Sequence, residues 1–250
     1  KAGLNAGVTI ANQDRLVVRH KVSIIQTLPV SYLERIARIY NGVDLTRFGP
    51  EPQDRRAVLP AGFAADDAVV IGTVGRMQNV KDQPTLARAF VALLAAQPAW
   101  RARLRLVLVG DGELRSEVEA ILAAAGAREL AWLPGSRDDV PALLAAFDVF
   151  VLPSQAEGVS NTILEAMACA RPVVATAVGA NAELLVDGET GRLVPARDPA
   201  AMGDALAAYA ASPALRAAHG AAGRARIEAQ FSLEAMVARY AGVYERALAG

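Results

Sequence analysis

The chain has 250 residues, with 26 basic and 26 acidic side chains and a formal net charge of zero. This balance argues against a nucleic-acid-binding protein, which would usually carry a basic excess. The single cysteine, Cys169, excludes an internal disulfide and fits a reducing compartment, and with only two histidines the chain offers no metal-ligand spacing. No uncharged apolar run reaches the roughly 18 residues of a transmembrane helix.

The first quarter of the chain is irregular, and the remainder alternates between apolar runs and helical patterns. Residues 36–44 predict a strand that leads into an Asn-Gly turn, and residues 50–62 predict a polar linker. Continuous apolar runs predict strands at 69–75, 104–110, 130–135, 148–154, 172–179 and 191–195. Helical spacing predicts helices at 82–97, 112–126, 139–147, 162–169, 199–211, 213–228 and 232–248. The alternation predicts an α/β fold, a Rossmann-like parallel sheet with helices on both faces and a helical C-terminal tail.

Two glutamates flank the loop after the fourth predicted strand, where ligands of open parallel sheets bind. The first amides of a helix that starts near Asn161 would form an anion site, and Gly158 would let the backbone approach a ligand closely. Glu165, one turn into that helix, could accept both hydrogens of a ribose diol, and Glu157 could accept from the hydroxyls of a second sugar. An anion site between two sugar-binding carboxylates would fit a nucleotide sugar, in which a diphosphate joins two sugars.

The same stretch has a purely structural interpretation. Thr162 and Glu165 match the spacing of a capping box, in which the glutamate only satisfies the helix start. Taken alone, the two interpretations of Glu165 are equally good. The capping box leaves Glu157-Gly158 and the polar pair Ser160-Asn161 unexplained.

The loop after the first predicted strand, GRMQNVKD at residues 75–82, contains Gly75, Arg76 and Lys81. Two cations there would neutralise a departing diphosphate, whose charge develops in the transition state. For either residue alone a structural explanation is better: Arg76 as a solvated loop arginine, and Lys81-Asp82 as the start of a helix.

Two further loops follow strands at the same edge. In GDGE, residues 110–113, Gly110 would permit a tight turn near the ligand, and a purely structural turn is equally good. Gly135-Ser136-Arg137 would form a wall for a nucleotide base. The chain has no G-x-G-x-x-G after a strand and no G-x-x-x-x-G-K-[ST], which weakens a dinucleotide dehydrogenase and a P-loop NTPase.

Several motifs coincide in one order, and together they resemble the retaining glycosyltransferases of family 4, which have the two-domain GT-B fold. The motifs are GRMQNVKDQPTL, LVLVGDGELR, FDVFVLPSQAEGVSNTILEAMA, RPVVATAVGANAELL and GETGRLVP. The similarity runs from about Ile39 to the end of the chain. Within the family, QNVKDQPTL and EGVSNTILEAMA most resemble sugar transferases of exopolysaccharide loci, including those that accompany exosortase-type systems.

The resemblance implies a role for each matching position. It places Glu157 near the donor sugar and Glu165 on the ribose, and makes Arg76 and Lys81 the diphosphate-binding pair. The loop Gly158, Val159, Ser160 and Asn161 matches the one whose amides hold donor phosphate or sugar. The family retains anomeric configuration and needs no bound metal, so no cofactor is expected.

Departures from the family pattern concern single residues and a whole domain. Ala170 and Ala180 stand where glycines are frequent, and each adds a methyl near the donor loop. We expect the amino-terminal, acceptor-binding domain of a GT-B enzyme to be missing from this chain or reduced to a remnant. We therefore expect three parts: residues 1–45 as that remnant and connecting segment, 46–230 as the donor-binding domain, and 231–250 as a helix that packs on the missing domain.

The sequence thus predicts the donor-binding half of a glycosyltransferase that uses a UDP-sugar or GDP-sugar and a glycan or lipid-linked acceptor. The expected location is cytoplasmic, with peripheral association at the inner face of the cell membrane, and no nucleic-acid partner. Two alternatives remain: a non-catalytic nucleotide-sugar-binding module that needs a partner chain, and a sugar-nucleotide epimerase of similar fold.

Overall fold

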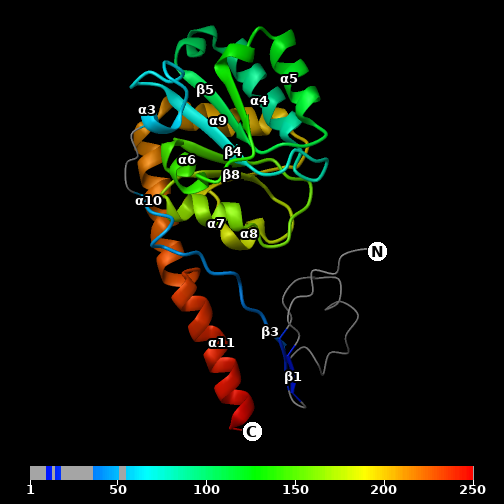
Figure 1. Ribbon diagram of the computed structural model, residues 1–250, viewed down its shortest axis with the longest axis vertical. Helices are drawn as coiled ribbons and strands as arrows, with labels where there is room; N and C mark the ends of the chain where they lie inside the picture. Colours follow the sequence, from blue (N-terminus) through cyan, green and yellow to red (C-terminus); the bar gives the residue numbers. More distant parts are fainter. Residues whose placement is uncertain (1–9, 13–14, 18–35, 51–54, 250) are drawn as a thin grey trace.

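The computed structural model describes residues 10–12, 15–17, 36–50 and 55–249. Most of the predicted remnant at 1–45, and residues 51–54 of the predicted linker, lie outside the described residues. The body of the molecule is one six-stranded sheet between two layers of helices (Figure 1).

The sheet is entirely parallel and has the order β6-β5-β4-β7-β8-β9. Its strands are β4 (Val69–Val74), β5 (Leu104–Val109), β6 (Ala131–Gly135), β7 (Val149–Leu152), β8 (Val173–Thr176) and β9 (Gly191–Val194). The four central strands are buried along nearly their whole length, because helices cover both faces. The predicted Rossmann-like parallel sheet is therefore confirmed.

Helices alternate with these strands and divide between the two faces. They are α3 (Arg55–Val58), α4 (Gln83–Ala96), α5 (Arg115–Ala124), α6 (Val140–Ala146), α7 (Asn161–Ala168), α8 (Asn181–Leu184), α9 (Pro199–Ala211), α10 (Pro213–Gln230) and α11 (Leu233–Leu248). Two short 3₁₀ helices, Pro98–Ala102 and Arg128–Leu130, precede β5 and β6.

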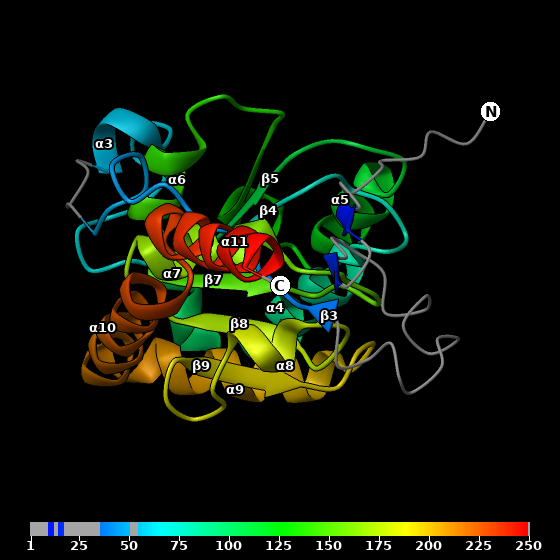
Figure 2. The ribbon, with the colours of Figure 1, turned by 90° about the horizontal axis from the view of Figure 1, so that it is seen from below.

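Side-chain alternation along each strand produces two separate cores. On one face, Ile71 of β4 packs in a cluster with Phe90 of α4 and Tyr209 of α9. On the other face, Val70 packs in a cluster with Ile163 of α7 and Ile227 of α10. The helices α7 and α8 lie beside β7 and β8 at the end of the body from which α11 departs (Figure 2).

The first quarter of the chain differs from the prediction. The predicted polar linker at 50–62 contains helix α3, because Leu59 after it is buried in the core. Instead of one strand at 36–44, only β3 (Ile36–Ala37) is extended, and it joins a small sheet with β1 (Ile10–Asn12) and β2 (Arg15–Val17). Residues 41–48 instead run against the body, where Val43 forms a bridge with Ser232. The cause is tertiary, since Val43 and Phe48 are buried in the same core cluster as α7.

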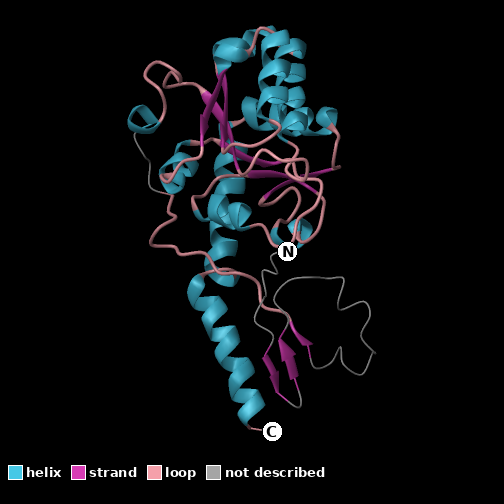
Figure 3. Cartoon of the chain, turned by 45° about the vertical axis from the view of Figure 1, so that its right-hand side comes forward, coloured by secondary structure: helices cyan, strands magenta, loops and turns pink. Residues whose placement is uncertain are grey.

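The small sheet and α11 both extend from the same end of the body (Figure 3). Ile39 and Val243 form a small buried cluster, with Ala37, Met236 and Tyr240 packed against it. The apolar face of α11 is therefore only partly covered, and Val237, Tyr244 and Leu248 remain exposed.

Candidate functional site

The loops that carry the predicted site residues all follow strands of the parallel sheet, so they meet at its carboxyl edge. The structure brings two of the predicted residues into direct contact. Lys81, after β4, lies with its Nζ 2.5 Å from Oε1 of Glu157, after β7. Both side chains are largely shielded, at 24% and 10% exposure, so this ion pair is less screened than a surface pair. Ser154 donates from its Oγ to the same carboxylate oxygen at 2.6 Å.

The loop that carries Arg76 rests on the GDGE turn. The Met77 amide donates to the Asp111 carbonyl at 2.8 Å, and the Met77 carbonyl accepts from Leu114 at 3.1 Å. A Cβ on Gly110 would lie 2.1 Å from the Gly75 carbonyl oxygen, so the close contact of the two backbones excludes a side chain at position 110. The GDGE turn thus has the structural role that the sequence left open, because its backbone supports the loop that carries Arg76.

The Arg76 side chain itself is exposed, while its backbone is fixed. Gln83, which is buried, donates from Nε2 to the Arg76 carbonyl at 3.0 Å. Arg76 therefore projects from a rigid backbone into the space outside the sheet.

Helix α7 starts at Asn161 with Ser160 as its N-cap. Thr162 accordingly lies within the first turn, and Glu165 is the fifth helical residue. The capping-box interpretation of Glu165 is wrong, because a capping box needs the glutamate three residues after the cap. The Ser160 side chain makes no cap bond either and lies 3.1 Å from the Thr162 hydroxyl. The first amides of α7 are therefore left for an external acceptor.

Glu165 lines a cavity of about 150 Å³. The cavity is bounded by Gly42, Val43, Asp44, Phe48, Asn161 and Leu164 in addition to Glu165. Burial raises the pKa of the Glu165 carboxyl, and the charge of Arg47 acts in the opposite direction. A hydrogen-bond donor from a ligand would stabilise the charged form of a carboxylate in this environment.

The contribution of residues 41–48 to this cavity was not predicted from the sequence. Most of them lie in the predicted connecting segment, yet the Asn41 side chain donates to Asn161 at 2.7 Å. The Asn-Gly turn was the only local sign that the chain changes direction here. The contact between Asn41 and Asn161 joins residues 120 positions apart, and neither of the two sequence stretches indicates it.

The remaining predicted residues are distributed around the same edge. Gly158 and Asn161 are exposed, whereas Val159 is half-buried and Ser160 is buried, so at these two positions the backbone is the better ligand group. Ser136 and Arg137 are exposed on the loop after β6. Arg137 pairs with Asp139 at 2.7 Å, and this hydrogen bond and charge raise the pKa of the guanidinium.

Among the described residues, no group of three histidine, cysteine, aspartate or glutamate side chains is arranged to hold a metal ion. Cys169 is buried, and burial raises the pKa of its thiol to about 11. In the part of the chain that the structure describes, no helix combines the length and hydropathy needed to cross a bilayer.

The family model described as "Glycosyl transferases group 1" matches residues 68–212, which contain the sheet and every predicted site residue. The chain belongs to this family.

Individual relatives of this glycosyltransferase family agree with the assignment. The chain is 35% identical to a lipopolysaccharide core biosynthesis mannosyltransferase of Rhizobium meliloti, over 83% of the chain and 60% of the relative. Sucrose-phosphate synthase from Thermosynechococcus elongatus matches with a TM-score of 0.72 and 29% identity, over 86% of this chain and 53% of that one.

A third similarity concerns a separate domain. The crystallised C-terminal domain of a glycosyl transferase group 1 family protein from Francisella tularensis matches with a TM-score of 0.67 and 25% identity. The match covers 77% of this chain and 100% of that domain. The chain spans about three fifths of the length of the mannosyltransferase. These similarities confirm the predicted fold, the Rossmann-like domain of a GT-B glycosyltransferase.

Proposed function

We propose that the chain is the donor-binding half of a retaining, metal-independent glycosyltransferase of family 4. The complete enzyme would transfer a sugar from a nucleoside-diphosphate sugar to a glycan or lipid-linked acceptor in polysaccharide synthesis. One observation carries the proposal: a shielded lysine–glutamate pair, an open helix start and a second, half-buried carboxylate share one edge of the sheet.

In this proposal the two cations bind the diphosphate. Lys81 lies beside Glu157, and Arg76 projects from a backbone that Gln83 fixes. When the bond between sugar and diphosphate breaks, negative charge accumulates on the leaving phosphate, and fixed cations stabilise it without reorganising. The free amides at the start of α7 add donors for the same group.

The carboxylates are assigned to the sugars. Glu165, in its small cavity, would accept from the ribose hydroxyls, and Glu157 from hydroxyls of the donor sugar. The exposed loop with Ser136 and Arg137 would border the base. Because these groups supply the charge stabilisation, a divalent metal is not required.

The remaining parts of the reaction belong to the rest of the enzyme. The mannosyltransferase relative, whose name assigns it to lipopolysaccharide core biosynthesis, supports a glycan acceptor. In the proposal, transfer takes place at the inner face of the cell membrane. Residues 1–45 would be the end of the acceptor-binding domain, and the partly covered face of α11 would pack on it. A non-catalytic module or an epimerase would share the donor site but would not transfer a labelled sugar when the amino-terminal domain is supplied.

The first experiment is calorimetric titration of the chain with UDP, GDP and ADP, repeated on Glu165→Ala. We expect saturable binding of one nucleotide, weakened at least tenfold by the substitution, because a charge-assisted hydrogen bond contributes about 1.5–3 kcal/mol. Absence of binding by the folded chain at millimolar nucleotide would contradict the proposal. Circular dichroism of the variant confirms that it is folded.

A further inference from the structure

Buried polar side chains from the Glu157 loop itself, from β8 and from α8 pack beneath Glu157. The one on the loop is Ser154, which is completely buried and donates from Oγ to Glu157 Oε1 at 2.6 Å. Lys81 contacts the same oxygen. Among the described residues, Oε2 of Glu157 thus remains for another donor.

Two more buried side chains extend this hydrogen-bonded chain from Ser154. Thr176, the last residue of β8, donates from Oγ1 to the Ser154 carbonyl at 2.5 Å. Asn181, the first residue of α8, donates from Nδ2 to the Thr176 carbonyl at 3.0 Å. All three side chains are fully buried, where polar groups are costly unless they form hydrogen bonds. A hydrophobic residue would fill each position at lower cost if packing were the only requirement.

The backbone of the loop between β8 and α8 also contacts the Glu157 loop. Gly179 has φ +55°, and a Cβ there would lie 1.9 Å from the Glu157 carbonyl oxygen. The Ala180 amide donates to the Gly158 carbonyl at 3.2 Å. The loop between β8 and α8 therefore contacts the Glu157 loop through both side chains and backbone.

We propose that Ser154, Thr176 and Asn181 are positioning residues that aim the Glu157 carboxylate at the donor sugar. Thr176 and Asn181 fix the Ser154 backbone, and the Ser154 hydroxyl then fixes one carboxylate oxygen beside Lys81. The inference rests on the proposed function, because that function supplies the sugar as the ligand of Glu157.

The test compares two substitutions of one residue. Thr176→Val keeps the shape of the side chain and removes the hydroxyl, whereas Thr176→Ser keeps the hydroxyl and removes a methyl. Each variant is titrated with UDP and UDP-glucose, and with GDP and GDP-mannose, and its Tm is measured. Ser154→Ala, which removes only the hydroxyl that contacts Glu157, provides a second variant if Thr176→Val does not fold.

We expect Thr176→Val and Ser154→Ala to weaken nucleotide-sugar binding about tenfold without weakening binding of the free nucleotide, because Lys81 remains available to the diphosphate. Thr176→Ser should bind both like the wild type, although it loses packing. A merely structural role predicts that Thr176→Ser binds the nucleotide sugar more weakly than Thr176→Val does, or that a variant loses equal affinity for nucleotide sugar and free nucleotide. Either result would overturn the inference.

Crystal structures of the variants separate this inference from the proposed function. If the wild type binds none of the four probes, the proposed donor site fails. The positioning role is then decided by geometry alone: it stands if Thr176→Val separates Lys81 Nζ and Glu157 Oε1 beyond 4 Å and Thr176→Ser preserves the contact. An unchanged contact in Thr176→Val refutes it.

Discussion

At the scale of single residues, the two glutamates of the site differ in their partners. Glu157 is paired with Lys81 and Ser154, whereas Glu165 lines a small cavity and burial raises the pKa of its carboxyl. Under the proposed function, the two carboxylates respond to a ligand differently. The diphosphate would compete with Glu157 for Lys81, and Glu165 would accept a hydrogen bond from the ribose.

Neutralising Glu157 should strengthen binding of the free nucleotide. In Glu157→Gln, Lys81 loses its carboxylate partner and a negative charge disappears beside the proposed diphosphate. We expect UDP or GDP to bind about fivefold more tightly, on the order of 1 kcal/mol, while sugar transfer by the complete enzyme falls. Calorimetry checks the affinity, with Glu189→Gln as an equal charge change at an exposed position. Weaker binding in Glu157→Gln would show that the ion pair does not compete with the ligand.

Neutralising Glu165 should stabilise the fold and weaken ligand binding. Because the folded pKa is raised, the folded state binds more protons than the unfolded state between pH 4.5 and that pKa. Wild-type stability therefore falls as pH rises through this window and stays lower above it. Glu165→Gln should raise Tm at pH 7 by on the order of 2 °C, a gain that vanishes near pH 4.

The same variant should bind nucleotide about tenfold more weakly, since the neutral amide replaces charge-assisted acceptors. Thermal melts from pH 4 to pH 8 and one titration at pH 7 check both effects. A Tm gain that persists unchanged at pH 4 would assign the effect to packing instead of desolvation.

At the scale of elements, helix α7 determines the position of the site and ends in an unusual way. Ala170 has φ +54°, in the left-handed region that favours glycine. The Ala170 amide donates to the Met167 carbonyl and the Arg171 amide to the Ala166 carbonyl, the two bonds of a Schellman motif. The family's frequent glycine at this position thus has a backbone reason, and the departure noted in the sequence is a source of strain.

Restoring the glycine should stabilise the protein. We expect Ala170→Gly to raise the free energy of unfolding by about 0.5–1 kcal/mol, since relief of the left-handed alanine exceeds the added entropy of the unfolded chain. Urea denaturation measures the change. Ala120→Gly, at an exposed position within α5, is the matched control and should lower stability by about 1 kcal/mol. A loss in both variants would contradict the strain.

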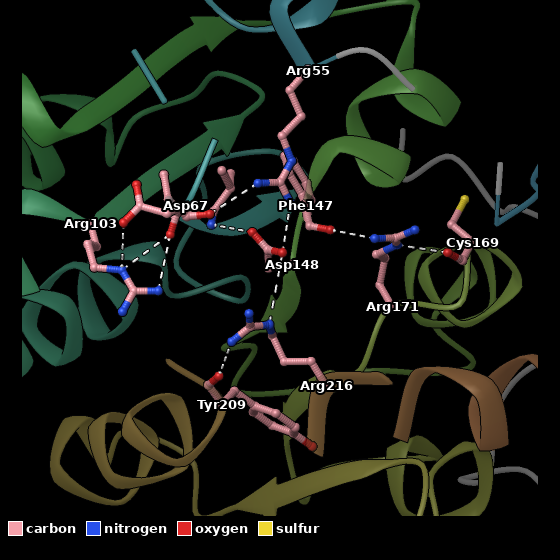
Figure 4. A network of polar contacts seen from close by, with 11 residues as sticks. Arg55, Asp67, Arg103, Phe147, Asp148, Cys169, Arg171, Tyr209 and Arg216 are labelled. Atoms are coloured by element: carbon pink, nitrogen blue, oxygen red, sulfur yellow. Dashed lines mark hydrogen bonds and ion pairs between the residues drawn. The ribbon is translucent and has the colours of Figure 1, made fainter. Parts of the chain in front are cut away.

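At the scale of the whole molecule, the edge of the sheet opposite the site is joined by an arginine–aspartate network (Figure 4). Asp148 accepts from the Val70 amide and pairs with Arg55 of α3 at 2.7 Å and, more loosely, with Arg216 of α10 at 3.9 Å. Arg216 also donates to the Tyr209 carbonyl at the end of α9. One carboxylate therefore connects both helical layers to the sheet.

Removing that charge should destabilise the molecule without affecting the site. Asp148→Asn leaves two shielded arginines without their shared partner, and we expect a loss of about 2–4 kcal/mol in the free energy of unfolding. The control is Asp67→Asn in the same network: its side chain is 69% exposed and pairs with Arg103 at 3.2 Å, so the loss should be below about 0.5 kcal/mol. Urea denaturation distinguishes them, and equal losses would refute the proposed importance of burial.

From residue 69 onward, the sequence by itself determined the order of the strands and longer helices, the parallel sheet and the loops that carry the site, because apolar periodicity and glycine positions are local signals. The short helices α3 and α8 were not predicted. It also placed Lys81 and Glu157 on loops that follow strands, and Glu165 about one turn into a helix. Local signals could not choose between a capping box and a ligand role for Glu165, since that depends on the residue at which α7 begins.

Only the tertiary structure decided which of these groups touch. The Lys81–Glu157 pair joins residues 76 positions apart, Thr176 reaches the Ser154 backbone, and residues 41–48 close the cavity of Glu165. Such contacts depend on how strands from distant parts of the chain are ordered in the sheet, and strand order has no signature in any short stretch of sequence. The residue types predicted the chemistry of the site, and the packing of the sheet determined its geometry.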